Sequence, residues 1–393
     1  MKKKMIALAA TSLASLSGAA FADTNVTVYG IIDGTFDVIN VSGGTATPLV
    51  PAKGTPRFNR VTSNGSRLGF KGTEELGNGM SAFFQFESNA KFDAGGGLDT
   101  GRDSFVGLKG GFGTVKLGNF SGPNRDLAGK LDVVIHSDGI GENSAIFGKL
   151  GGFGSYFDTR YTNSIAYITP KFSGLEGTLH YQANENKDET PGAGINTSLY
   201  EIGLKYDNGP VFIGFAHGKL REKNDAGNID PSTSLAYKPK FGMGTDSEVT
   251  ETRLGGMYKF DVASVRLMYG RTKAEGSLGE LKQNVWGIGG TYNVTANGKL
   301  LAQYYSADDL SGNHTAKPAD LSETGAKFWV LGYEHSLSKR TTLIAHYAQM
   351  KNDSRTSTVA GAGKGYDFGD GKTGFTGNNV KLSGIQLGVN HAF

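Results

Sequence analysis

The residue types that most often carry catalysis or bind metals are few and scattered in this sequence. There is no cysteine, which excludes a disulfide framework, a thiolate metal site and a cysteine nucleophile. Neither H-E-x-x-H nor G-x-S-x-G occurs. The histidines show no metal-ligand spacing; they are His136, His180, His217, His314, His335, His346 and His391. The sequence therefore predicts no enzyme and no cofactor, while a hydrolase assembled from different strands stays a minor alternative.

One short motif has the form of a nucleotide-binding site. GDGKT at 369–373 looks like the end of a phosphate-binding loop, but Tyr366 stands where that motif needs glycine. We interpret it as the tip of an outer loop. Basic residues are not interleaved with aromatic ones as they are on nucleic-acid-binding surfaces, so no nucleic-acid partner is predicted.

Composition narrows the class of protein further. The 393 residues include 60 glycines, 23 phenylalanines and 16 tyrosines, with 40 basic and 37 acidic side chains. This is too aromatic for a disordered chain. A mean hydropathy of −0.30 argues against a bundle of membrane helices. These values suit a soluble β protein or an outer-membrane barrel.

The first 22 residues have the pattern of a secretory signal peptide. Lys2, Lys3 and Lys4 precede the apolar stretch 5–16, and the sequence Ala20-Phe21-Ala22 offers a cleavage site before Asp23. A buried N-terminal helix is the alternative. Removal of the three lysines leaves 37 basic against 37 acidic side chains, so the mature chain 23–393 is formally neutral. An exported chain without cysteine fits the envelope of a Gram-negative bacterium.

Short segments of alternating apolar and polar residues follow the predicted signal peptide. In the last of them Ile385, Leu387 and Val389 share one face, and Gln386 and Asn390 share the other. About sixteen such segments occur, near 25–39, 57–72, 80–92, 100–110, 113–120, 159–170, 176–184, 198–207, 210–220, 249–260, 263–273, 283–293, 298–307, 325–336, 341–351 and 380–393. Each is predicted to be a β-strand.

The connections between these segments alternate in length. Short turns such as NGP and TANG alternate with long polar stretches near 40–56, 121–158, 221–248, 308–324 and 352–379. A transmembrane barrel has short turns at one end and long loops at the other, with an apolar outside and a polar inside. We therefore predict an all-β, 16-stranded antiparallel transmembrane β-barrel spanning 23–393.

Several motifs resemble one family, the general porins of β-proteobacterial outer membranes. The similar stretches are VTVYGIIDGTFDV at 26–38, SRLGFKGTEELGNGMSAFFQFE at 66–87, GRDSFVGLKGGFGTVKLGNF at 101–120, TNSIAYITPKFSGLEG at 162–177 and LGYEHSLSKRTTLIAHYA at 331–348. The chain also ends in Phe393, which in such barrels serves as an assembly signal. One departure is His391, where an aromatic or apolar residue is common.

The resemblance implies a homotrimer in outer-membrane lipid, with one water-filled channel per subunit for ions and small hydrophilic solutes. It implies that the third outer loop, about 121–158, folds into the barrel and narrows it. That loop carries Asp126, Asp132, Asp138 and Glu142. The alternative is a loop that stays outside in solvent. An outer-membrane adhesin that uses its outer loops is the competing function, and calcium binding among loop carboxylates stays open.

The same resemblance places a positive wall opposite that loop, formed by Arg67, Arg102 and Arg160. Alternation supports an inward position for Arg67, which lies opposite Leu68 and Phe70, and for Arg160, which lies opposite Tyr161, Ile165 and Tyr167. Arg102 is ambiguous because Val106 and Leu108 share its parity. Asp33 and Asp37 face the lumen by the same logic. The alternative is that these arginines serve structural ion pairs; as a filter they would favour anions.

Cleavage of the signal peptide is directly testable. We expect the outer-membrane form to begin at Asp23, with the sequence DTNVTVYG, because the A-x-A site ends at Ala22. N-terminal sequencing by mass spectrometry would show this. An intact Met1 in the outer-membrane form would contradict it.

Overall fold

The structure is a computed structural model of the chain. It describes residues 25–44, 56–95, 98–99, 101–134, 139–154, 157–184, 187, 195–224, 246–315, 321–354, 365–369, 373 and 379–393. The predicted signal peptide and Asp138 lie outside these residues, so both remain predictions. Within the described part, no helix is long and apolar enough to cross a membrane.

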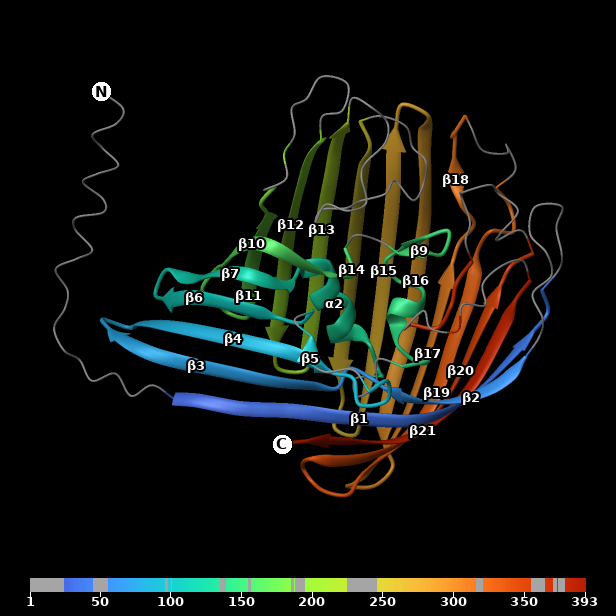
Figure 1. The fold of residues 1–393 in the computed structure, drawn as a ribbon, viewed down its shortest axis with the longest axis horizontal. Helices are drawn as coiled ribbons and strands as arrows, with labels where there is room; N and C mark the ends of the chain where they lie inside the picture. The colour runs from blue at the N-terminus through green and yellow to red at the C-terminus, as the bar shows by residue number, and fades with distance from the viewer. Residues whose placement is uncertain are drawn as a thin grey trace.

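The structure is one closed antiparallel sheet (Figure 1). Its first half comprises β1 (Asn25–Ser42), β2 (Arg57–Ser63), β3 (Arg67–Gly77), β4 (Met80–Ala90), β5 (Leu98–Asp99), β6 (Ser104–Gly110), β7 (Gly113–Ser121), β10 (Arg160–Ile168), β11 (Leu175–Gln182) and β12 (Ile195–Asn208). Its second half comprises β13 (Val211–Asn224), β14 (Glu248–Lys259), β15 (Ala263–Gly276), β16 (Gly279–Asn293), β17 (Gly298–Ala307), β18 (Ser311–Gly312), β19 (Ala326–Ser336), β20 (Thr341–Asn352) and β21 (Lys381–Ala392).

The barrel wall has the predicted 16 strands. The sheet counts 19, but β2 and β3 pair with successive parts of β1 and form one wall strand, and β5 and β18 are two-residue pieces. The third outer connection contributes α2 (Pro123–Leu131), the short 3-10 helix η1 (Asn143–Ala145), and the hairpin β8 (Lys149–Leu150) and β9 (Phe153–Gly154). The longest strand is β1, of 18 residues; β12 to β16 have 12 to 15 residues, and β6 has seven.

Alternation along each strand separates two faces, as predicted. On β21, Ile385 and Leu387 are about half exposed, at 49% and 52%, whereas Gln386 between them is fully buried. The face that carries the exposed apolar side chains is the outside of the barrel, because lipid rather than water must cover them. The other face, with buried Asp, Glu, Arg, Gln and His side chains, is called the inner face below.

Strands β1 and β21 close the barrel along a continuous ladder from Ile31–Ala392 to Ser42–Lys381. The end of the chain completes this seam, since the backbone N–H of Phe393 donates to Gly30 O at 3.1 Å and Gly30 N–H donates to Phe393 O at 3.2 Å. A Cβ at Gly30 would lie 2.3 Å from the Phe393 ring, so only glycine admits the ring here.

Deletion of Phe393 should therefore impair barrel assembly. It removes two backbone hydrogen bonds and the ring that covers Gly30, at the point where the sheet must close. We expect a lower yield of folded barrel, measured as the band that migrates anomalously on unheated gels. Phe393→Tyr, which keeps the backbone contacts and a ring, is the matched control. A normal folded yield for the deletion would contradict this role.

Candidate functional site

Two of the three predicted arginines meet at one carboxylate on the inner face. Arg102 forms an ion pair with Glu87 Oε1, and Arg67 Nε lies 3.5 Å from Glu87 Oε2. The Tyr29 hydroxyl donates a hydrogen bond to the same Oε2 at 3.0 Å. The ambiguity of Arg102 is resolved because β6 begins at Ser104, so Arg102 precedes the strand and its parity does not apply. It is only 8% exposed.

The third arginine, Arg160, pairs with a different carboxylate. Its guanidinium contacts Asp103, and its side chain is one-fifth exposed. The predicted alternation is wrong on this side of β10, because Tyr161 is buried inside the barrel instead of facing outward. Alternation therefore no longer supports an inward position for Arg160, and what ties it to the interior is its contact with Asp103, which acts electrostatically on Asp126 of the third outer loop. The register shifts between Tyr161 and Ser164, where Asn163 has a φ of +53°. A β-bulge of this kind inverts the alternation on one side of the irregularity.

The inner wall contains charged groups besides the three predicted arginines. Asp37, predicted to face the lumen, is fully buried and accepts hydrogen bonds from Arg60 at 3.0 Å and from Gln386 of the closing strand. Glu87 and Asp103 hold the arginines described above. Glu87 alternates with Phe86 on β4, so the alternation in FFQFE was a sequence signal for its inward position. No sequence signal indicated which arginines Glu87 and Asp103 would contact.

The loop carboxylates differ in their surroundings. Asp126 is exposed and lines a cavity of about 430 Å³ together with Lys130, Glu176 and Lys205. Asp132 is 3% exposed and accepts hydrogen bonds from the backbone of Val134 and Asn143, at 2.9 and 2.7 Å.

Burial raises the pKa of Asp132 to about 7, although these backbone bonds act in the opposite direction. Because Asp132 accepts hydrogen bonds from two backbone N–H groups of its own loop, it stabilises the fold of that loop. Glu142 is half-buried and caps η1, its carbonyl accepting from Ala145 N–H.

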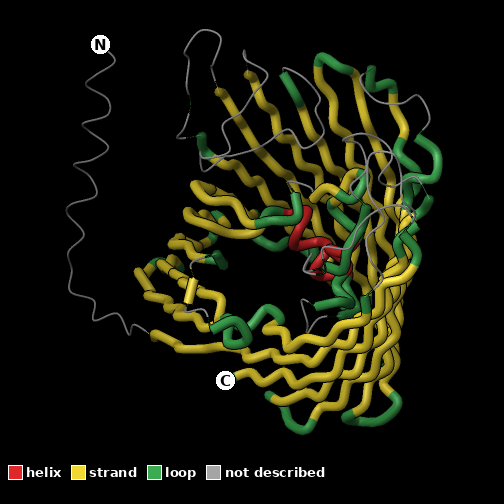
Figure 2. The backbone as a smooth tube through the Cα atoms, turned by 45° about the vertical axis from the view of Figure 1, so that its right-hand side comes forward, coloured by secondary structure: helices red, strands yellow, loops and turns green. Residues whose placement is uncertain are grey.

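The third outer connection packs against the inner face of the barrel wall. Figure 2 shows the helix α2 within the opening that the strands enclose. Its contacts extend from β12 to β15. Wall glycines receive its apolar side chains: a Cβ at Gly214 would lie 2.4 Å from Leu127, and one at Gly255 would lie 2.3 Å from Leu131. Larger residues at these two positions would force the helix off the wall.

A buried arginine ties both ends of this loop to β14. Arg253 is fully buried; its Nε donates to Glu251 at 2.5 Å, and its Nη1 donates to Asn124 O at 2.9 Å and lies 3.4 Å from Asp158 Oδ1. Nearby, Glu201 of β12 accepts from the Asn124 backbone and side-chain amides at 2.9 and 2.8 Å. The wall thus anchors the loop through charge-assisted hydrogen bonds, which are the stronger kind.

A second outer connection also reaches inside. Tyr366 and Phe368, from the stretch after β20, are fully buried in the same apolar cluster as Leu131 and Phe147. Gln283 on β16 joins the two connections, since its Oε1 accepts from Gly151 N–H at 2.8 Å and from the Tyr366 hydroxyl at 2.6 Å.

The charged groups of the inner face are placed where they can interact with a passing solute. Among the described residues, no three His, Asp or Glu side chains are placed to hold a metal ion. The inner face instead carries guanidinium and carboxylate groups on a wall whose outside is apolar. Ions that pass such a wall interact with its charges through confined water, where screening is weaker than on an open surface.

Comparisons with known proteins agree with this architecture. A family model described as Gram-negative porin matches residues 9–355. The chain is 31% identical to outer membrane porin protein 32 of Delftia acidovorans, with both chains covered completely. It is 30% identical to an outer membrane porin protein of Bordetella pertussis, over 94% of this chain and all of the relative. Among solved structures, the anion-selective porin from Comamonas acidovorans matches with a TM-score of 0.69 and 26% identity, over 94% of this chain and all of that one.

A closed 16-stranded barrel with an apolar outside and a charged interior defines an outer-membrane channel. The chain belongs to the Gram-negative porin family. It is accordingly an outer-membrane porin and not an enzyme.

Loss of the Arg253 anchor should loosen the loop. Arg253→Met leaves Glu251 buried without its partner, which typically costs about 3–5 kcal/mol. We expect urea unfolding at lower concentration and larger current fluctuations in single-channel recordings. The double variant Arg253→Met, Glu251→Gln is the control, because it removes both charges and should recover part of the stability. A quiet, wild-type current from Arg253→Met would show that this anchor does not hold the loop.

Proposed function

We propose that this porin passes ions and small hydrophilic solutes by passive diffusion with a preference for anions. Its constriction would lie between the arginine wall of Arg67, Arg102 and Arg160 and the third outer loop. The observation that carries the proposal is the sharing of one carboxylate, Glu87, by two guanidinium groups. This arrangement leaves an excess of positive charge, and guanidinium stays protonated at any working pH.

The loop side of the proposed constriction carries both signs of charge. Asp126 interacts electrostatically with Lys116 of β7 and Lys205 of β12. Among the predicted acidic residues we assign the opposing role to Asp126 and Glu142, whereas Asp132 holds the loop together; Asp138 keeps the role that the resemblance implies. That a relative of 26% identity is titled an anion-selective porin supports the proposed preference.

We also propose a homotrimer. The family resemblance supports it, as does a trimer form among the structural neighbours, OmpT of Vibrio cholerae, which is 16% identical to this chain and shares its fold. Each barrel closes on itself, so the trimer would add packing between complete walls. Conductance of reconstituted protein should then rise in groups of three equal steps. An adhesin that uses this barrel only as a support would show no reproducible conductance.

Replacing the arginines should shift ion selectivity. Arg67→Gln with Arg160→Gln removes two positive charges from the proposed arginine wall, so the zero-current potential in a KCl gradient should move toward cation preference. Glu87→Gln and Asp126→Asn should each move it toward anions. Lys219→Gln, on the outside of the barrel, is the matched control and should leave the potential unchanged. A wild-type potential from the double arginine variant would show that these arginines do not line the constriction.

A further inference from the structure

Three lysines stand side by side on the outside of the barrel. Lys327 of β19 pairs in register with Lys351 of β20, which pairs in turn with Lys381 of β21. All three are exposed and share the face of the exposed Leu331 and Ile385. They lie at the end of these strands that carries the long connections, which in this architecture is the outer-leaflet end. We call them the lysine row.

The lysine row has no ion-pair partner within 4.0 Å in the described part of the chain. Asp353 interacts with Lys327 and Lys351 electrostatically, at a separation beyond that of an ion pair. Directly opposed residues on neighbouring strands have Cβ atoms about 5 Å apart, and like charges at that separation destabilise a sheet. The row is therefore an arrangement that an external anion would stabilise.

An apolar groove adjoins the lysine row on the same face. It measures about 420 Å³, within the range of ligand sites, and its lining is almost entirely apolar, including Ile288, Ala302, Tyr304, Trp329 and Leu331. Trp329 is two residues from Lys327, about 7 Å along the strand. Moving outward, the surface thus changes from apolar through aromatic to cationic over a few residues.

We propose that the groove and the lysine row form a binding site for an anionic, phosphate-bearing lipid of the outer leaflet. An acyl chain would lie in the groove and the phosphate would contact the lysines. Tryptophan beside the head group matches its usual place at a membrane interface. Lysine stems can extend along the apolar surface while their ammonium groups reach the phosphate layer. The site lies outside the channel and does not depend on the proposed selectivity.

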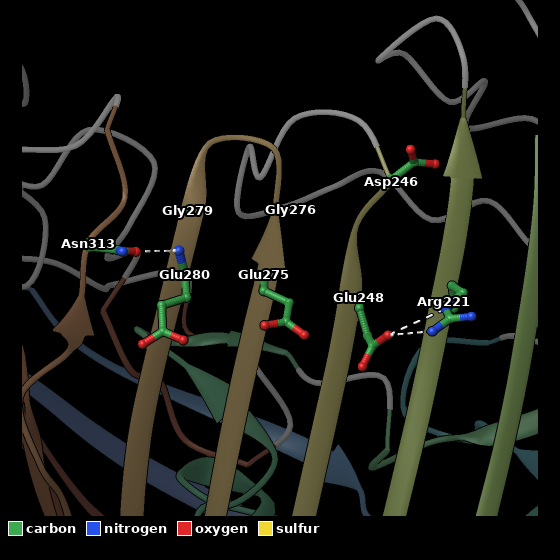
Figure 3. Close-up of a pocket in the computed structure, with 8 residues that line it drawn as sticks. All are labelled: Arg221, Asp246, Glu248, Glu275, Gly276, Gly279, Glu280 and Asn313. Carbon is green, nitrogen blue, oxygen red and sulfur yellow. Dashed lines mark hydrogen bonds and ion pairs between the residues drawn. The ribbon is translucent and has the colours of Figure 1, made fainter.

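On the neighbouring part of the outer face, the basic residues have carboxylate partners, unlike those of the lysine row. On β13 to β16, Lys219, Arg221, Lys273 and Lys282 form ion pairs with Glu248, Glu275 and Glu280. Figure 3 shows Arg221 pointing toward Glu248, with Glu275 and Glu280 on the neighbouring strands. The Arg221–Glu248 pair measures 3.2 Å, and these residues line a pocket of about 600 Å³. This ion-paired belt carries lysines on the same face as the lysine row, but its own carboxylates already neutralise them.

The proposal can be tested with a fluorescent reporter that the chain already contains. It has two tryptophans, Trp286 and Trp329, so Trp286→Phe leaves Trp329 alone beside the site. This variant would be reconstituted in bilayers that contain brominated phosphatidylglycerol or brominated phosphatidylcholine, which quench tryptophan on contact. The measurement is the relative association constant of the two lipids at Trp329.

We expect phosphatidylglycerol to be preferred by about fivefold or more, the factor that one basic residue contributes at an anionic membrane surface. Changing Lys327, Lys351 and Lys381 to Gln should bring the ratio to about 1. The control, Lys219, Lys273 and Lys282 to Gln, removes the same charge from the ion-paired belt and should keep the preference. Ala302→Phe, which fills the groove without changing charge, should reduce quenching by both lipids.

Three results would overturn the proposal. The first is an unchanged ratio after the change of the lysine row. The second is an equal loss from the control triple variant, which would show a general effect of charge. The third is dissociation of the oligomer on unheated gels by the lysine-row variant with unchanged quenching, because the row would then be a contact with a second copy of the chain. Millimolar inorganic phosphate should not displace the lipid more than the same ionic strength of NaCl.

Discussion

The pairing of every backbone N–H and C=O group is the constraint on which the rest of this structure depends. Lipid offers no hydrogen-bond partner, so a sheet that crosses it must close on itself. Closure puts β1 beside β21, and Phe393 and Gly30 complete the seam through two backbone hydrogen bonds. Along each strand it also places alternate side chains in lipid and the side chains between them inside the barrel. Polar side chains are thereby confined to the inner face and to the two ends of the outer face.

The polar interior requires hydrogen-bond and ion-pair partners for its charged side chains. Charged side chains on a half-buried wall need partners, and the wall supplies them across strands: Glu87 for two arginines, Asp37 for Arg60, and Glu251 for Arg253. The third loop is held by the same kind of contact and by glycines that admit its leucines. The arginines predicted to form the filter are ion-pair partners in the structure. The filter role that we propose for them would belong to the same guanidinium groups.

Strand positions and faces could be predicted because they depend on local alternation. The segment near 380–393 became β21 with the expected residues outside. The face of Tyr161 could not be predicted, because it depends on a β-bulge. The local sequence indicates that bulge only through Asn163, a residue type that tolerates positive φ. The partners of Arg67, Arg102 and Arg160 come from other strands, and alternation does not determine register. The path of the loop depends on glycines that are distant in the sequence, such as Gly214 beside Leu127 and Gly255 beside Leu131, and no short-range pattern records those contacts.

Gln283 gives the barrel a mechanical connection between its surface and its interior. One oxygen atom accepts from Gly151 in the third loop and from Tyr366 in the connection after β20, whose flanking residues lie at the outer end of the wall. The backbone N–H of Gly365 also donates to Gly151 O at 3.3 Å, so the two connections contact each other directly as well as through β16. A displacement of Tyr366 would therefore remove one donor from Gln283 and disturb the neighbouring contact with the third outer loop at the same time.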